Sequence, residues 1–340
     1  MALLPGTIMP VNKTSRIVLA LFALTLVPVM ASETMADESA TDWLMKMSRA
    51  AQTLNYRGHF VYQHDGQMEA MEIVHQVSAG QVRERLLSLN GAKREIIRNN
   101  DEIRCYLPDE NAITVSRASM TTKNFPALVP AMLETLKPFY RFALGQTRRI
   151  GGRPAREVQI MPADEYRYGH RFWADQATGL LVQAELLANG GEVLEQFMFT
   201  HVDIGANIAR SELEPTTGHK QMVTHDSDGD GELTDNTGDT RVWQAQWMPR
   251  GFVVKSYRRA MKPMSNQQMT HIVLSDGLAA VSVFIEPARS AQNDGGNRMG
   301  AVNAWRRHLA QFQITVVGEV PEKTVRKIAE QMRWQAGKER

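Results

Sequence analysis

The sequence has almost no cysteine, since Cys105 is the only one among 340 residues. A single cysteine cannot form an internal disulfide, so packed cores rather than covalent cross-links must stabilise the chain. We expect Cys105 to be a small apolar core residue and not a nucleophile.

Long apolar runs are also absent, apart from one near the N-terminus at residues 17–31. Lys13 and Arg16 precede this run, and Val29-Met30-Ala31 ends it. This order of positive, apolar and small residues is typical of a secretory signal peptide. The run is shorter than the roughly 20 residues of a comfortable membrane span. We therefore predict a cleaved signal peptide over residues 1–31 and a periplasmic mature protein; an uncleaved anchor is the alternative.

The chain lacks an excess of either charge. It has 39 basic and 37 acidic residues, and loss of the signal peptide removes Lys13 and Arg16 but no acid, which leaves 37 of each. A neutral mature chain gives no electrostatic reason to expect nucleic-acid binding.

Catalytic motifs are missing as well. The sequence contains no G-x-S-x-G or H-E-x-x-H motif, and no glycine-rich phosphate loop opens a helix. His271, Ser275 and Asp276 lie close together in the sequence, as in a catalytic triad. However, Ser275-Asp276-Gly277 separates two strand patterns and is better explained as a hairpin turn. We predict no catalytic residues and no enzymatic activity.

What the sequence does contain is a long series of short strand patterns. A helix is expected over residues 39–54, with apolar residues at helical spacing. Alternating segments separated by turn pairs such as Asp65-Gly66 then predict an antiparallel meander that continues to residue 202. A proline-punctuated apolar stretch, Phe125 to Leu144, interrupts it and predicts a helix against the open face of the sheet. The fold expected for residues 32–205 is mostly β, an unclosed antiparallel barrel with a helical plug.

The composition changes at residues 206–240, which are polar and rich in aspartate and glycine. This segment is the predicted linker. Residues 241–340 are expected to form a smaller α+β domain, with four antiparallel strands, a loose segment at 291–298, a strand at 313–318 and a final helix over Pro321 to Trp334.

The first domain contains many aromatic residues, which would line the concave face of an unclosed barrel. They form either an ordinary core or a cavity for an apolar ligand, and the sequence leaves both open. The candidate lipid-pocket residues are Phe60, Tyr62, Tyr106, Phe139, Phe142, Phe172 and Trp173.

The linker contains a segment that is close to a calcium loop. Asp226, Asp228 and Asp230 occupy loop positions one, three and five, Gly231 supplies the turn, and Glu232 offers its backbone carbonyl. The final bidentate glutamate is missing, so a weak calcium site and a solvated acidic linker remain as alternatives. No other cofactor is expected.

Taken together, several motifs resemble the RseB/MucB family of periplasmic sigma-E regulatory proteins. Each is weak alone, and their order and spacing carry the resemblance across nearly all of the mature sequence. The motifs are residues 56–62, 83–86, 94–96, 105–108, 172–175, 178–181, 249–252, 275–279, 281–286 and 317–321. The aspartate-rich linker is not a feature that we associate with this family.

The resemblance implies a first domain similar to lipoprotein carriers and a smaller second domain. It also implies a partner, the periplasmic segment of a membrane-spanning anti-sigma factor of the RseA/MucA type. Family members bind this segment and shield it from proteolysis, and lipid or lipopolysaccharide fragments relieve the shielding. The alternative is a periplasmic lipid or lipoprotein carrier; a homo-oligomer also stays open.

Within that implied function, we expect the second domain to make most of the partner contact. In the segment from Arg250 to Arg259, Phe252, Val254 and Ser256 alternate with Val253, Lys255 and Tyr257, so both faces of the strand are usable, and the segment ends in positive charge. Its basic residues would pair with acidic groups, and an aromatic ring would anchor an apolar side chain. A half-buried strand with a solvated basic end is the alternative. The candidate partner-binding residues are Phe252, Lys255, Tyr257, Arg258 and Arg259.

Overall fold

The computed structural model describes residues 38–100, 102–117, 133–216, 223–226, 242–261, 268–288 and 293–335. The signal peptide lies outside these residues, and so do Asp228, Asp230 and Glu232 of the calcium-like segment. The predictions made for them therefore stay predictions.

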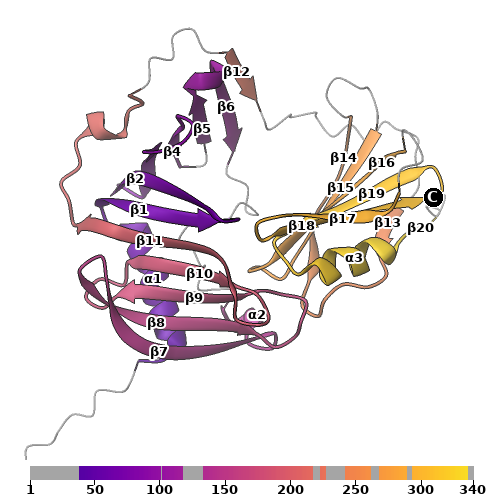
Figure 1. Cartoon of the computed structure of the whole chain (residues 1–340), viewed down its shortest axis with the longest axis horizontal. Helices are drawn as coiled ribbons and strands as arrows, with labels where there is room; N and C mark the ends of the chain where they lie inside the picture. The colour runs from indigo at the N-terminus through magenta and orange to yellow at the C-terminus, as the bar shows by residue number, and fades with distance from the viewer. Residues whose placement is uncertain are drawn as a thin grey trace, which may run out of the picture. The chain divides into compact units, whose positions relative to one another are not determined.

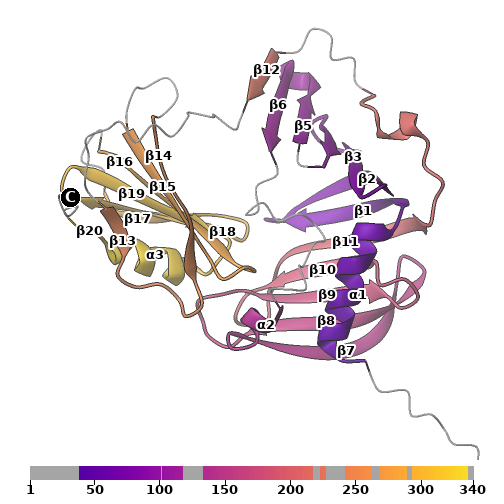
Figure 2. The ribbon, with the colours of Figure 1, turned by 180° about the vertical axis from the view of Figure 1, so that it is seen from behind.

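The first helix, α1 (Ala40–Thr53), lies where the apolar spacing predicts a helix. Ser39 caps it: its hydroxyl accepts the Asp42 amide, and the Asp42 carboxylate accepts the Ser39 amide. Leu44 and Met47 on the apolar face are buried, and the helix contacts strands β7 (Tyr140–Ile150), β8 (Arg153–Pro162) and β10 (Leu181–Leu187). Burial of this face fixes α1 against one side of the sheet (Figures 1 and 2).

Most of the chain before residue 226 forms one sheet, called here the large sheet, in the order β12-β6-β5-β4-β3-β2-β1-β11-β10-β9-β8-β7. All neighbours are antiparallel except β12 and β6, which are parallel. The sheet is unclosed, with β12 and β7 at its edges (Figure 1). Its strands are β1 (Tyr56–His64), β2 (Gln67–Ser78), β3 (Gln81–Ser88), β4 (Glu95–Asn99), β5 (Glu102–Leu107), β6 (Ala112–Arg117), β7 (Tyr140–Ile150), β8 (Arg153–Pro162), β9 (Gly169–Asp175), β10 (Leu181–Leu187), β11 (Val193–Ile204) and β12 (Val223–Asp226).

The hairpin turns arise where the sequence predicts them. Between β1 and β2, Asp65 and Gly66 both have positive φ, 47° and 74°. Two successive positive φ angles match the right-handed twist of a tight hairpin, and aspartate and glycine tolerate them. The 3₁₀ helix η1 (Pro108–Glu110) connects β5 to β6. The predicted mostly β, unclosed architecture is thus confirmed.

The helix expected over Phe125 to Leu144 is wrong in the part that the structure describes. Only Leu133–Leu136 is helical (α2), and Tyr140 already begins β7. Pro138 cannot continue a helix, and from Tyr140 onward the large apolar residues Phe142 and Leu144 recur at every second position, the period of a strand. Residues 125–132 lie outside the described residues. Among the described residues, the long helix that packs on the large sheet is α1.

Residues after 242 form a second, smaller core. Six antiparallel strands, called here the small sheet, run in the order β14-β15-β16-β19-β18-β17, and β13 pairs with β20 separately. Helix α3 packs on β17, β18 and β19. The elements are β13 (Val242–Ala245), β14 (Val253–Met261), β15 (Gln268–Ser275), β16 (Ala280–Pro287), β17 (Gly295–Met299), β18 (Val302–Leu309), β19 (Phe312–Gly318), α3 (Glu322–Glu330) and β20 (Met332–Gln335).

Two predictions for this region need correction. The final helix ends at Glu330, not at Trp334, because residues 332–335 pair with β13 as strand β20. The segment at 291–298, expected to be loose, ends in strand β17, and strand β18 was not predicted at all. Val325, Ile328 and Met332 of this final segment have no exposed surface and belong to the second core.

Candidate functional site

The interior of the large sheet holds a cluster of aromatic rings. Phe60 lies 6.0 Å from Phe197 and 5.8 Å from Phe199, edge to face, and Phe199 lies 6.2 Å from Tyr56. Phe60 is only partly buried, whereas Phe199 is fully buried. This apolar face, partly covered by α1, is the surface on which an acyl chain would gain free energy by burial.

The structure brings six of the seven predicted lipid-pocket residues into this core. Tyr62 adds a polar group, because its hydroxyl donates to Glu195 at 2.7 Å. Burial, together with the Glu195 carboxylate, raises the pKa of Tyr62 above its usual range, so the phenol stays protonated. The six residues are Phe60, Tyr62, Phe139, Phe142, Phe172 and Trp173.

Trp173 belongs to this core but is covered by an arginine, whereas Tyr106 lies in another cluster. Trp173 follows Phe172 in β9, so the two side chains point to opposite faces of the sheet. The guanidinium of Arg148 covers the Trp173 ring at 3.7 Å from its centroid, and the ring is 2% exposed. Tyr106 packs with Ile97 and Ile113 in a separate small cluster. Of the seven predicted residues, Tyr106 therefore lies outside the large-sheet core.

Phe139 lies at a junction between the two cores. A Cβ atom on Gly251 would overlap the Phe139 ring, and Gly251 has a φ of +86°, which side chains rarely adopt. Glycine therefore allows the segment before β14 to pack directly on this ring. Next to it, the guanidinium of Arg167 lies 5.4 Å from the Phe139 centroid and 5.0 Å from that of Phe252.

Arg167 is the centre of a buried ion pair that sequence reasoning missed. Its Nε donates to Asp276 at 2.6 Å, and neither side chain has exposed surface. The Tyr140 hydroxyl donates to the same Asp276 oxygen at 3.0 Å, and Arg167 also donates to Asp164 and to the carbonyl of Arg250. Burial and the Asp276 charge raise the pKa of Tyr140 above its usual range. Arg167 Nε and the Tyr140 hydroxyl therefore both point at the Asp276 carboxylate.

Asp276 belongs to the turn that joins β15 and β16. Its second oxygen accepts the amides of Leu278 and Ala279, at 2.9 and 2.8 Å. This geometry confirms that Ser275-Asp276-Gly277 is a hairpin turn and not part of a catalytic triad. Leu278, at the tip, packs against the core of the large sheet. The sequence predicted the turn, but it gave no sign that Asp276 pairs with Arg167.

The predicted partner-binding segment forms the edge strand β14. Within the described residues, β14 pairs only with β15, and a bulge between Val254 and Ser256 leaves Lys255 without a register partner on β15. Val253 and Val254 are 50% and 53% exposed, which is unusual for adjacent apolar residues. An exposed edge with unpaired backbone groups can accept another extended chain.

The five candidate residues of this segment divide into two groups. Lys255 and Arg258 are exposed. Phe252, in contrast, is 5% exposed and belongs to the core of the small sheet. Tyr257 is partly buried, its hydroxyl accepting the amide of Trp243, and the Arg259 guanidinium lies 5.9 Å from the Tyr257 centroid. The basic residues, and not the aromatic ones, thus provide the accessible groups.

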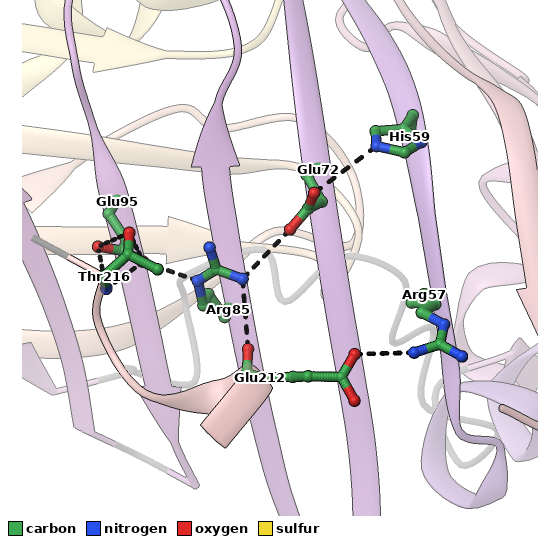
Figure 3. A network of polar contacts seen from close by, with 7 residues as sticks. All are labelled: Arg57, His59, Glu72, Arg85, Glu95, Glu212 and Thr216. Atoms are coloured by element: carbon green, nitrogen blue, oxygen red, sulfur yellow. Dashed lines mark hydrogen bonds and ion pairs between the residues drawn. The ribbon is translucent and has the colours of Figure 1, made fainter. Parts of the chain in front are cut away.

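The predicted linker begins with a segment that is firmly attached to the large sheet. We call residues 205–216 the strap; it includes the 3₁₀ helix η3 (Arg210–Leu213). Buried Glu95 accepts the amide and hydroxyl of Thr216, and it also accepts Arg85 Nε at 2.7 Å. Arg85 in turn donates to the Glu212 carbonyl at 3.3 Å (Figure 3).

Charge pairs continue this network across the sheet. Arg57 binds the Glu212 carboxylate at 2.8 Å, and Glu72 lies between Arg85 and His59, at 3.2 and 3.6 Å (Figure 3). The hydrogen bond from the Ala209 amide, together with Arg57, lowers the pKa of Glu212. The network therefore holds the strap across strands β1 to β4.

Metal binding finds no support in the part of the chain that the structure describes. No group of three or more histidine, cysteine or acidic side chains is arranged there to hold an ion. The backbone of Asp226 ends strand β12, while the other calcium-loop candidates lie outside the described residues. Cys105 is half-buried, and burial raises the pKa of its thiol. No helix in the described residues is long and apolar enough to cross a membrane.

Comparisons with known proteins agree over almost the whole chain. The family models for the MucB/RseB N-terminal and C-terminal domains match residues 39–217 and 237–333. The sigma factor AlgU regulatory protein MucB of Pseudomonas aeruginosa is 32% identical over 95% of this chain and 98% of its own length. The sigma-E factor regulatory protein RseB of Escherichia coli K12 is 28% identical over 86% of this chain and 90% of its own.

Solved structures of similar proteins point to the same family. A crystal structure of MucB in complex with MucA(peri) is 30% identical, covers 88% of this chain and 100% of its own, and has a TM-score of 0.69. A second complex, Pseudomonas aeruginosa MucA/MucB, has a TM-score of 0.70 at the same identity and 88% coverage. The resemblance drawn from the sequence motifs is confirmed: the chain belongs to the MucB/RseB family.

Proposed function

We propose that this protein is an exported, non-catalytic regulator of a sigma factor. In the periplasm it binds the periplasmic segment of a membrane-spanning anti-sigma factor and shields that segment from proteolysis. The observation that carries the proposal is the likeness, over 88% of this chain, to MucB in complex with MucA(peri). Relatives of nearly equal length that are named as sigma factor regulatory proteins support it further.

The partner contact that we propose is the outer edge of β14. Exposed Val253 and Val254 supply apolar contacts, and Lys255 and Arg258 supply positive charge for an acidic segment. A carrier of lipids or lipoproteins is the alternative function. The large sheet and α1 would suffice for a carrier, so the second core with its exposed basic strand favours the regulator.

A protease-protection assay tests the proposed contact. The partner's periplasmic segment is digested with and without the wild-type protein and the variant Arg258→Glu with Arg259→Glu. We expect the variant to lose protection at least tenfold while it keeps the wild-type melting curve. The control, Arg49→Glu with Arg210→Glu, makes the same change of charge at two exposed arginines away from β14 and should protect fully. Equal protection by both variants would remove β14 as the interface.

Lipid is the second proposed ligand, and it would relieve the protection. A lipid shifts the equilibrium only if it binds the partner-free protein more tightly than the complex. Adding an acylated amphiphile should therefore reduce protection by the wild-type protein. Protection that stays constant at saturating lipid would exclude this regulation and leave the anti-sigma factor contact standing alone.

A further inference from the structure

The tip of the β15–β16 hairpin has the chemistry of an anionic amphiphile. Asp276 supplies a carboxylate, and Leu278, two residues later, supplies an apolar group that packs on the core of the large sheet. The groups that receive them lie on the large sheet and in its connections: Tyr140 begins β7, and Arg167 lies in the connection from β8 to β9.

The receiving site is built for an anion. The Arg167 side chain has no exposed surface, and a guanidinium buried to this extent is costly unless an anion accompanies it. Its Nε and the Tyr140 hydroxyl converge on one carboxylate oxygen, at 2.6 and 3.0 Å. Asp164, its other acidic partner, is partly exposed and three residues away in the chain. A carboxylate or phosphate oxygen could replace that of Asp276 without changing these donors.

Apolar surface continues directly from this site. Phe139 and Tyr140 flank the guanidinium, with ring centroids at 5.4 and 5.6 Å. Both residues pack on the large-sheet core, to which Phe142 and Phe172 also belong. An acyl chain attached to the bound anion would therefore meet the apolar surface that Leu278 now covers.

We propose that Tyr140 and Arg167 form a binding site for the anionic head group of an acylated amphiphile, and that Asp276 and Leu278 occupy it as an internal substitute for this ligand. Ligand and hairpin exclude each other, so binding requires the hairpin to leave. Because the hairpin joins strands of the small sheet, which includes β14, the ligand would act on the half of the molecule that we propose to contact the anti-sigma factor. The inference deepens the proposed function and rests on it for its biological meaning.

Calorimetry with three ligands of equal chain length tests the site. Laurate and dodecyl phosphate carry the two anionic head groups, and dodecanol carries none. In Asp276→Asn the amide oxygen can still accept the turn amides, but the ion pair with Arg167 is lost. Loss of the ion pair should raise the fraction of molecules in which the hairpin has left the site, and the observed dissociation constant falls as this fraction rises. We therefore expect at least tenfold tighter binding of laurate or dodecyl phosphate. Dodecanol should bind Asp276→Asn at least threefold more weakly than laurate, because it offers no anion to Arg167.

The preferred head group is the one, carboxylate or phosphate, whose ligand binds Asp276→Asn more tightly. Asp276→Asn with Arg167→Met should bind laurate and dodecanol alike, because the charged donor is gone. Asp294→Asn, at an exposed carboxylate of the same half, is the control and should bind all three ligands as the wild type does. If laurate and dodecyl phosphate both bind Asp276→Asn within twofold of wild type, or bind the double variant as tightly as Asp276→Asn, the site does not exist.

Hydrogen exchange gives a second measurement on the unaltered protein. Laurate should speed exchange of the amides of Leu278 and Ala279, which the Asp276 carboxylate accepts in this structure. If laurate binds while the exchange rates of these two amides stay the same, the ligand does not displace the hairpin and the proposal is wrong. Calorimetry and hydrogen exchange are both done without the anti-sigma factor, so their outcomes are independent of the protease-protection assay.

Discussion

At the residue scale, buried carboxylates in this protein are held by donors that stabilise their charge. Asp175 is 1% exposed and accepts Arg153 Nε at 2.8 Å. Its other oxygen accepts the Thr178 amide and hydroxyl, at 2.9 and 2.7 Å. Burial alone raises the pKa of Asp175, but the hydrogen bonds from Arg153 and Thr178 together outweigh it, so the pKa lies below its usual value.

A depressed carboxylate pKa makes a pH-dependent contribution to stability. Asp175 contributes fully above the pKa of the unfolded chain, about 3.9, and the contribution is lost as pH falls through the lower folded pKa. We expect Asp175→Asn to lower the free energy of unfolding by about 1.5–3 kcal/mol at neutral pH. The deficit should shrink below about pH 4, as measured by urea unfolding across this range.

The control is Asp203→Asn, at a carboxylate that is half exposed and 3.6 Å from Arg57. Surface pairs of this kind contribute about 0–1 kcal/mol, so little change is expected at any pH. A deficit for Asp175→Asn that is constant from neutral to acidic pH would mean that packing, and not charge, explains its effect.

At the element scale, the strap depends on one buried acid. Glu95 has 1% of its side chain exposed and binds both Arg85 and Thr216. Glu95→Gln keeps an acceptor for Thr216 but leaves Arg85, itself 9% exposed, without its nearest anion. Removing one partner of a buried pair costs about 3–5 kcal/mol. We expect faster hydrogen exchange throughout residues 206–216 and a lower melting temperature.

The matched change, Glu102→Gln, removes an exposed carboxylate that pairs with Arg104 on the same sheet. It should leave exchange of the strap unchanged. If Glu95→Gln also leaves the strap protected, the apolar contacts of Ile208 and Leu213 with Val74 hold it without the ion pairs.

Elements were predictable where local pattern and tertiary packing agree. The cap at Ser39 and the apolar face of α1 are properties of neighbouring residues, and the sequence placed this helix to within one residue at each end. Residues 140–144 were misassigned because apolar spacing suits either period when the segment is short. Strand β20 was missed because its pairing with β13, about ninety residues earlier, is not encoded locally.

The residues of the candidate sites were likewise predictable only where their placement follows from local sequence pattern. Aromatic residues of the large sheet could be identified as core, since most of them alternate along strands. The face on which Trp173 lies depends on the exact register of β9, and the position of Tyr106 depends on where a long sheet curves. The pairing of Arg167 with Asp276 joins residues 109 positions apart, and one sequence contains no signal for it.

At the scale of the whole molecule, a single connection between β8 and β9 contacts the second core through consecutive residues. Glu165 pairs with Lys323, and the Tyr166 carbonyl accepts the Thr324 hydroxyl. The Tyr168 hydroxyl accepts Asn303 at 2.9 Å. With the Arg167 pair between them, these contacts should make the two cores unfold together.

The last prediction concerns this coupling. Arg167→Met leaves Asp276 buried without its cation, which costs about 3–5 kcal/mol at the junction and nothing within either core. Wild type should unfold in one denaturant transition, with amides of α1 and of β19 losing protection at the same midpoint. The variant should show separate midpoints for the two elements. Arg326→Met, which removes only an exposed guanidinium 5.6 Å from the Trp305 centroid, should keep the single transition. Coincident midpoints in Arg167→Met would mean that the contacts of Glu165, Tyr166 and Tyr168 suffice to couple the cores. The Asp276 hairpin could then leave its site without separating them.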